Sequence, residues 1–117
     1  MRRGNYRKFS RKSGQRQALY KSLATALIDH GKIKTTSAKA KSLSSFADKL
    51  VTTARKADIS SRRELTRTFH PKTVTKLINE IAPRFSDKKG GYTRVIRLER
   101  RKSDGSQMAI IEWTTSV

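Results

Sequence analysis

Cations dominate the amino-terminal end of this chain. The first 28 residues contain eight Lys or Arg and no acid, and the first carboxylate belongs to Asp29. Charged side chains are costly to desolvate and like charges repel, so these residues cannot bury one another. Arg makes bidentate contacts with phosphate, and Tyr6 and Phe9 could stack on unpaired bases. We therefore predict a polyanion-binding arm whose contacts come from Arg2, Arg3, Arg7, Lys8, Arg11, Lys12 and, at its base, Arg16.

A second basic segment surrounds a pair of glycines. Residues 88–94 read Lys-Lys-Gly-Gly-Tyr-Thr-Arg. Two glycines let a backbone pass close to a ligand, and their amides can face phosphate, although a plain turn before a strand is the alternative. We predict RNA contacts from Lys88, Lys89, Gly90, Gly91, Tyr92 and Arg94, with Lys39, Lys41, Arg62 and Arg63 extending the same basic face. Arg97, Arg100 and Arg101 are weaker candidates, and some of them are expected to face neighbouring proteins.

The sequence offers little for catalysis or for metal binding. It has no Cys, no phosphate-loop motif and no Gly-x-Ser-x-Gly motif. The two histidines are 40 positions apart: His30 ends a predicted helix, and His70 precedes Pro71, where capping or phosphate contact is expected. The nine acids are scattered without a spacing that favours acid–base work. We predict a protein that is not an enzyme and needs no cofactor.

The overall charge favours a nucleic-acid partner. The 117 residues include 28 basic and nine acidic side chains, a net charge of +19, whereas a small soluble domain needs a charge of only about 2 to 8. No run of apolar residues is long enough to span a membrane, and the first residues lack the apolar core of a secretory signal. An Arg-rich, acid-free start also fits an organelle transit peptide.

Helices are expected to position most of these cations. Leu19, Leu23 and Leu27 repeat every four residues, which predicts a helix from Ser13 to the stop at Gly31. Further stripes predict a helix after Thr36, carrying Ala40 to Ala54, and a helix over 73–81 that ends before Pro83. Between them, Ser61 and Glu64 have capping-box spacing for a short helix through Leu65 and Phe69.

Three segments have the character of strands. Residues 32–36 alternate and are predicted to form an edge strand, while 92–101 and 108–113 flank a Ser-Asp-Gly turn signal. Trp113 is expected in the core rather than on a stacking surface. We predict an α+β fold, a two-layer domain of about four helices on a small three-stranded sheet with a basic N-terminal extension. Its organisation would be an arm over 1–12 and one globular domain over 13–117.

Several sequence motifs resemble a known family. They are Ile33-Lys34-Thr35-Thr36 followed by Lys39-Ala40-Lys41-Ser42-Leu43, Ala82-Pro83-Arg84, Gly90-Gly91-Tyr92-Thr93-Arg94, and Met108-Ala109-Ile110-Ile111-Glu112. In order and spacing they resemble the bacterial-type ribosomal protein L17 family of the large subunit over nearly the whole chain. Arg3, Gln15, Ser103 and Trp113 depart from the usual family residues.

The resemblance implies a structural constituent of the large ribosomal subunit. Its partners would be large-subunit ribosomal RNA, near the nascent-chain exit, and neighbouring ribosomal proteins, with no membrane and no small-molecule substrate. It would support subunit assembly and translation in the cytoplasm. Similarity that reaches the first residues argues against an added presequence, although an organellar origin stays open.

Three rival classes remain. A DNA-binding protein would rest on the same phosphate neutralisation, but the 73–81 helix offers only Lys76 and Asn79 to base edges. A small RNA-modifying enzyme would need a nucleophile or base that the sequence lacks. A cationic membrane-active peptide would not need a patterned domain of this length.

Overall fold

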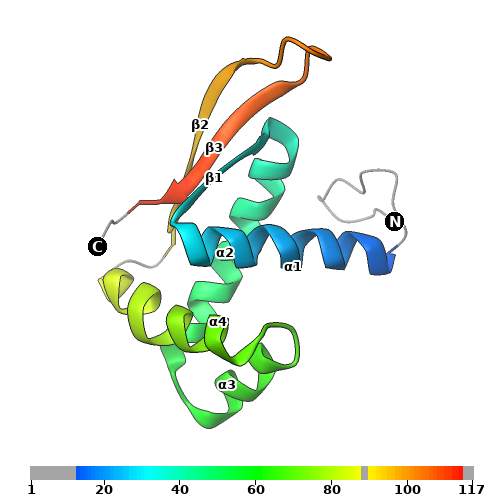
Figure 1. Cartoon of the computed structure of the whole chain (residues 1–117). Coiled ribbons are helices and arrows are strands. Elements are labelled where there is room, and N and C mark those ends of the chain that lie inside the picture. Colours follow the sequence, from blue (N-terminus) through cyan, green and yellow to red (C-terminus); the bar gives the residue numbers. More distant parts are fainter. Residues whose placement is uncertain (1–12, 88–89, 115–117) are drawn as a thin grey trace, which may run out of the picture.

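The structure, a computed structural model, describes residues 13–87 and 90–114. In these ranges, helices and a three-stranded antiparallel sheet make an α+β fold, as predicted (Figure 1). The arm over residues 1–12 and the pair Lys88 and Lys89 lie outside the described residues. The elements are α1 (Ser13–His30), β1 (Lys32–Thr36), α2 (Ser37–Lys56), α3 (Ile59–Thr66), α4 (Pro71–Lys76), a π-helical turn (Leu77–Ile81), a 3-10 turn (Ala82–Phe85), β2 (Thr93–Arg100) and β3 (Gln107–Trp113).

The first two helices end where local chemistry predicts. Gly31, with φ 84°, stops α1, and its N–H donates to the Leu27 carbonyl at 2.8 Å. Thr36 caps α2 by accepting the Lys39 N–H at 3.4 Å, as expected from its position. At the other end of α2, Ala57 takes a left-handed conformation with φ 51°.

The predicted capping box was wrong. Asp58, rather than Ser61, caps α3: its Oδ1 accepts the Ser61 N–H at 2.7 Å, and the helix already begins at Ile59. An aspartate three residues before that amide competes for the same role, and its carboxylate is the stronger acceptor. Glu64 is exposed, on a helix that is already capped.

The helix predicted over 73–81 is longer and less regular than expected. His70 caps α4 by accepting the Lys72 N–H at 3.1 Å, in agreement with the capping role predicted for it. The chain then forms a π-helical turn and a 3-10 turn, and it passes through Pro83 instead of ending before it. Proline lacks an N–H but is tolerated in the first turn of a helical segment, which is where Pro83 lies.

The sheet order is β1-β3-β2, so β1 is an edge strand as predicted. Along each strand, successive side chains point to opposite faces of the sheet. Ile33, Ala109 and Ile111 join the core with α2, whereas Lys34 and Ile96 are exposed on the outer face. A register shift between Arg97 and Arg100 interrupts the pairing of β2 with β3.

One cluster of buried residues links the helices to the sheet. It includes Leu27, Leu43, Val74 and Ile111, each fully buried, and Trp113, which is 5% exposed. The core position predicted for Trp113 is confirmed, and its indole Nε1 donates to the Leu27 carbonyl at 3.2 Å. This contact fixes the C-terminal half of α1 against β3.

Candidate nucleic-acid interface

The predicted basic residues on helices lie at two separate places. Lys39 and Lys41 are in the first turn of α2, where Lys41 is exposed and Lys39 is half-buried. Arg62 and Arg63 are exposed on α3, beyond the far end of α2 (Figure 1). A helix of the length of α2, 20 residues, spans about 30 Å. The structure therefore places these two pairs along an extended surface and does not bring them into one cluster.

The Gly-Gly-Tyr-Thr-Arg segment runs alongside the middle of α2. The Tyr92 N–H donates to Asp48 Oδ1 at 3.3 Å, and the Thr93 and Ser44 hydroxyls are 2.7 Å apart. Burial raises the pKa of the Asp48 carboxyl, although the hydrogen bond from Tyr92 acts in the opposite direction. These contacts tie the start of β2 to α2, so the path of the backbone through Gly90 and Gly91 is set from one side.

The side chain of Tyr92 does not lie on the surface, and the RNA contact expected at this residue stays a prediction. It is 1% exposed, and its ring centroid lies 5.1 Å from that of Phe85. Its hydroxyl accepts a hydrogen bond from Arg55 Nη1 at 2.7 Å, and the Arg55 guanidinium carbon lies 5.9 Å from the ring centroid. Its ring packs into the core from the start of β2, where Phe85 and Arg55 contact it.

Gly91 has the backbone conformation for which glycine is suited. Its φ is 65°, and a Cβ built on it would meet no atom within 4 Å. Gly90 is equally open but is without a positive φ. Both residues are exposed, so this stretch of backbone is accessible from outside. The expected close approach of RNA here stays a prediction.

Arg94 is exposed but already has an acidic neighbour. Its Nη2 and Nε lie 2.6 and 3.0 Å from Glu112 Oε2, and the two residues are directly paired across β2 and β3. Its side chain is still 53% exposed. Arg101 likewise pairs with Asp104, whose pKa is lowered by the hydrogen bond from the guanidinium. A phosphate at Arg94 would share the guanidinium with Glu112.

The residues that brace this segment could not be found from the sequence. Asp48 and Arg55 lie on α2, 44 and 37 positions before Tyr92, and each is one polar residue among several on that helix. Arg55 also donates to the Ser86 carbonyl at 3.0 Å. A long-range pair of this kind leaves no periodicity and no local spacing by which it could be found.

The described part of the chain holds no group of three or more His, Cys, Asp or Glu residues placed to bind a metal ion. No helix among the described residues is long and apolar enough to cross a membrane. The candidate interface consists of exposed cations on α2, α3 and β2 and of accessible backbone at Gly90 and Gly91.

Comparison with known proteins shows which family the chain belongs to. A family model described as "Ribosomal protein L17" matches residues 19–114. The chain belongs to the ribosomal protein L17 family. This family consists of structural ribosomal proteins, which agrees with the prediction that the chain is not an enzyme.

Individual L17 relatives match over nearly their full length. A protein of Symbiobacterium thermophilum, named large ribosomal subunit protein bL17, is 47% identical over 108 residues, covering 92% of this chain and 96% of the relative. A protein of the same name from Helicobacter hepaticus is 49% identical over 111 residues, covering 94% and 96%. The L17 match includes α1 through β3 from residue 19 onward, and it confirms the family predicted from the sequence motifs.

Proposed function

We propose that this chain is a structural constituent of the large ribosomal subunit. It binds large-subunit ribosomal RNA through the basic arm and the exposed cations of the domain, and it works in the cytoplasm as part of the ribosome. The observation that carries the proposal is the match, at 47 to 49% identity over more than nine-tenths of the chain, to proteins named as large-subunit proteins.

The charge distribution supports RNA as the main partner. A net charge of +19 on 117 residues is far above what solubility requires, and Lys41, Arg62 and Arg63 are all exposed. Cations that replace counterions along closely packed phosphates gain free energy through counterion release. Lys39 and Lys41 on α2 are well separated from Arg62 and Arg63 on α3. This separation fits an extended RNA surface better than one small anion.

Neighbouring ribosomal proteins are proposed as secondary partners. Arg97 and Arg100 are exposed on β2, in the part of the strand where the register shifts. This part of the hairpin lies at the opposite end of the molecule from α3 (Figure 1). It could thus reach a different neighbour from the one near Arg62 and Arg63.

Salt-dependent binding to purified large-subunit RNA tests the arm. Replacing the six cations of residues 2–12 by Gln keeps the chain length and should flatten the slope of log K against log salt. The loss is about 0.7 to 0.9 for each phosphate contact, hence at most about 4 to 5 for six contacts. An unchanged slope would show that the arm does not contact phosphate.

Two double variants test the domain surface separately. Lys39→Gln with Lys41→Gln, and Arg62→Gln with Arg63→Gln, should each reduce the slope by about 1 to 2. Because the pairs are far apart, their effects should add. Lys72→Gln, an exposed lysine outside the proposed surface, is the control. Sedimentation of the tagged chain from a lysate completes the test: migration with chromosomal DNA, or at the top of the gradient, would contradict the proposed function.

A further inference from the structure

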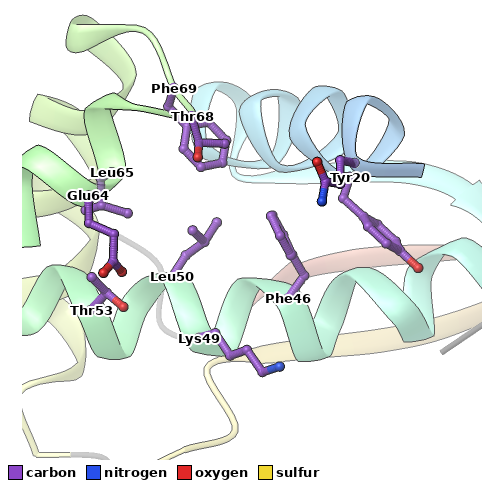
Figure 2. A pocket seen from close by; sticks show the side chains of 10 residues that line it. Tyr20, Phe46, Lys49, Leu50, Thr53, Glu64, Leu65, Thr68 and Phe69 are labelled. Carbon is purple, nitrogen blue, oxygen red and sulfur yellow. The ribbon is translucent and has the colours of Figure 1, made fainter. Parts of the chain in front are cut away.

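A cavity of about 360 Å³ lies between α1, α2, α3 and the segment that joins α3 to α4 (Figure 2). Leu65 and Phe69, each 3% exposed, form its buried floor. Phe46 and Leu50 form a half-buried wall, and the Phe46 ring stacks on that of Tyr20 with centroids 5.5 Å apart and planes inclined by 22°. This volume is near the lower end of the range for cavities that hold small organic ligands.

Polar groups surround the cavity at its rim. Gln17, Glu64 and Thr68 line it and are exposed, so they supply an amide, a carboxylate and a hydroxyl around an apolar interior. Flat apolar walls with donors and acceptors at the edge match the chemistry of a nucleobase, which has two apolar faces and a polar edge. A free phosphate or another small anion does not fit, because Glu64 would repel it and the floor is apolar.

The surroundings favour a base attached to a polyanionic backbone. Lys49 is exposed and lines the cavity, and Gln17 lies in the second turn of α1, only a few residues after the basic arm. A net charge of +19 draws a phosphate backbone toward the protein, while Glu64 keeps phosphates at the rim and can accept from an exocyclic amino group.

We propose that this cavity holds one unpaired nucleobase of large-subunit ribosomal RNA, with its face against Phe46 and Leu50 and its edge toward Gln17, Glu64 and Thr68. The inference rests on the proposed function and adds a site to it. The phosphate contacts would position the protein on the RNA. The base in the cavity would be the one group that the protein recognises by shape and by hydrogen bonds.

Photocrosslinking and base protection test the site with the full chain bound to purified large-subunit RNA. Trypsin would release the aromatic wall in the peptides 17–21 and 42–49. We expect a single-nucleotide adduct on one of these peptides after ultraviolet irradiation, and one base that the protein shields from chemical modification.

Gln17→Trp fills the cavity from its rim, and Gln15→Trp is the matched control. Both glutamines are exposed on α1, but residues two positions apart on a helix do not share a face, and Gln15 does not line the cavity. Stacking losses for one base predict a rise in Kd of about 5- to 150-fold for Gln17→Trp and loss of the protected base. Gln15→Trp should bind and protect like the unmodified chain. Thr68→Trp, with exposed Thr75→Trp as its control, repeats the test should Gln17→Trp fail to fold.

The outcomes separate this inference from the proposed function. If the unmodified chain binds RNA tightly and the cavity-filling variants bind with the same Kd and the same protected bases, the nucleobase site is wrong and the proposed function stands. The same holds if the cavity-filling variants lose only thermal stability, as a cavity occupied by the chain itself or by a protein side chain would predict. If the unmodified chain does not bind ribosomal RNA, both are wrong.

Discussion

Tyr92→Phe distinguishes a structural tyrosine from one that contacts RNA. The substitution keeps the buried ring and removes only the hydroxyl that accepts a hydrogen bond from Arg55 Nη1 at 2.7 Å. Hydrogen bonds to charged groups contribute about 1.5 to 3 kcal/mol net. Arg55 is only half-buried and retains the Ser86 carbonyl as a partner, so we expect a loss at or just below the lower end of that range, about 1 to 1.5 kcal/mol.

Thermal unfolding and RNA binding, measured on the same samples, give the answer. A loss of about 1 to 1.5 kcal/mol corresponds to a decrease in Tm of roughly 3–7 °C for a domain of this size. The Kd for large-subunit RNA at 20 °C should not change, because the ring does not reach the surface. A double-mutant cycle with Arg55→Met should give a coupling of about 1 kcal/mol. A weaker RNA affinity with an unchanged Tm would refute this reasoning and return Tyr92 to the interface.

Two further substitutions test how the local backbone is fixed. Asp58→Ala removes the α3 cap and should lower the Tm at pH 7, whereas Asp58→Asn should largely preserve it. The pKa of Asp58 is lowered by the hydrogen bond from the Ser61 N–H, so its stabilisation is present above the unfolded pKa near 4 and is lost as pH falls through the lower folded value. The difference between the Tm values of the unmodified chain and Asp58→Ala should therefore shrink toward pH 2, and a constant difference would contradict the charge-assisted cap. Gly91→Val places a β-branched residue at φ 65°, costing about 1 to 3 kcal/mol, and should reduce incorporation into large subunits, whereas Gly90→Ala should be neutral. Equal incorporation of both would remove Gly91 from the proposed RNA contacts.

The helices and the edge strand could be predicted because their signals are local. Each signal works within a turn or two of the chain: leucines at every fourth position favour a helix, Gly31 ends one and Thr36 caps the next. The structure has α1 and α2 within these limits. The errors arose where two local signals competed. Asp58 and Ser61 are both good caps, and the sequence does not show which residue the tertiary fold leaves outside the helix. Pro83 is a helix breaker in an interior but is accommodated in a first turn.

The candidate site was harder to predict because it depends on distances across the fold. Sequence identifies cations, but it does not show how far Lys41, near the start of α2, lies from Arg63 on α3, which follows the other end of α2. Nor does it show that Tyr92 packs inward against Phe85. The aromatic wall of Phe46 and Tyr20 also joins residues of two helices, and each of them alone reads as part of a core stripe. Long-range packing decides which aromatic side chains remain available to a ligand.

The same packing holds α1, the helix that follows the predicted arm in the sequence. In the C-terminal half of α1, Leu27 and Ile28 are buried, and the Trp113 indole donates a hydrogen bond to the Leu27 carbonyl. This end of the helix is therefore fixed to the sheet. Toward its other end, Gln15, Gln17 and Ala18 are exposed and the helix carries Arg16. A rigid helix that leaves the core in this way sets the point and direction from which the basic residues begin. If the basic residues before this helix bind RNA as proposed, their contacts begin from a helix that packing already holds in place, so this attachment adds little to the ordering cost of binding.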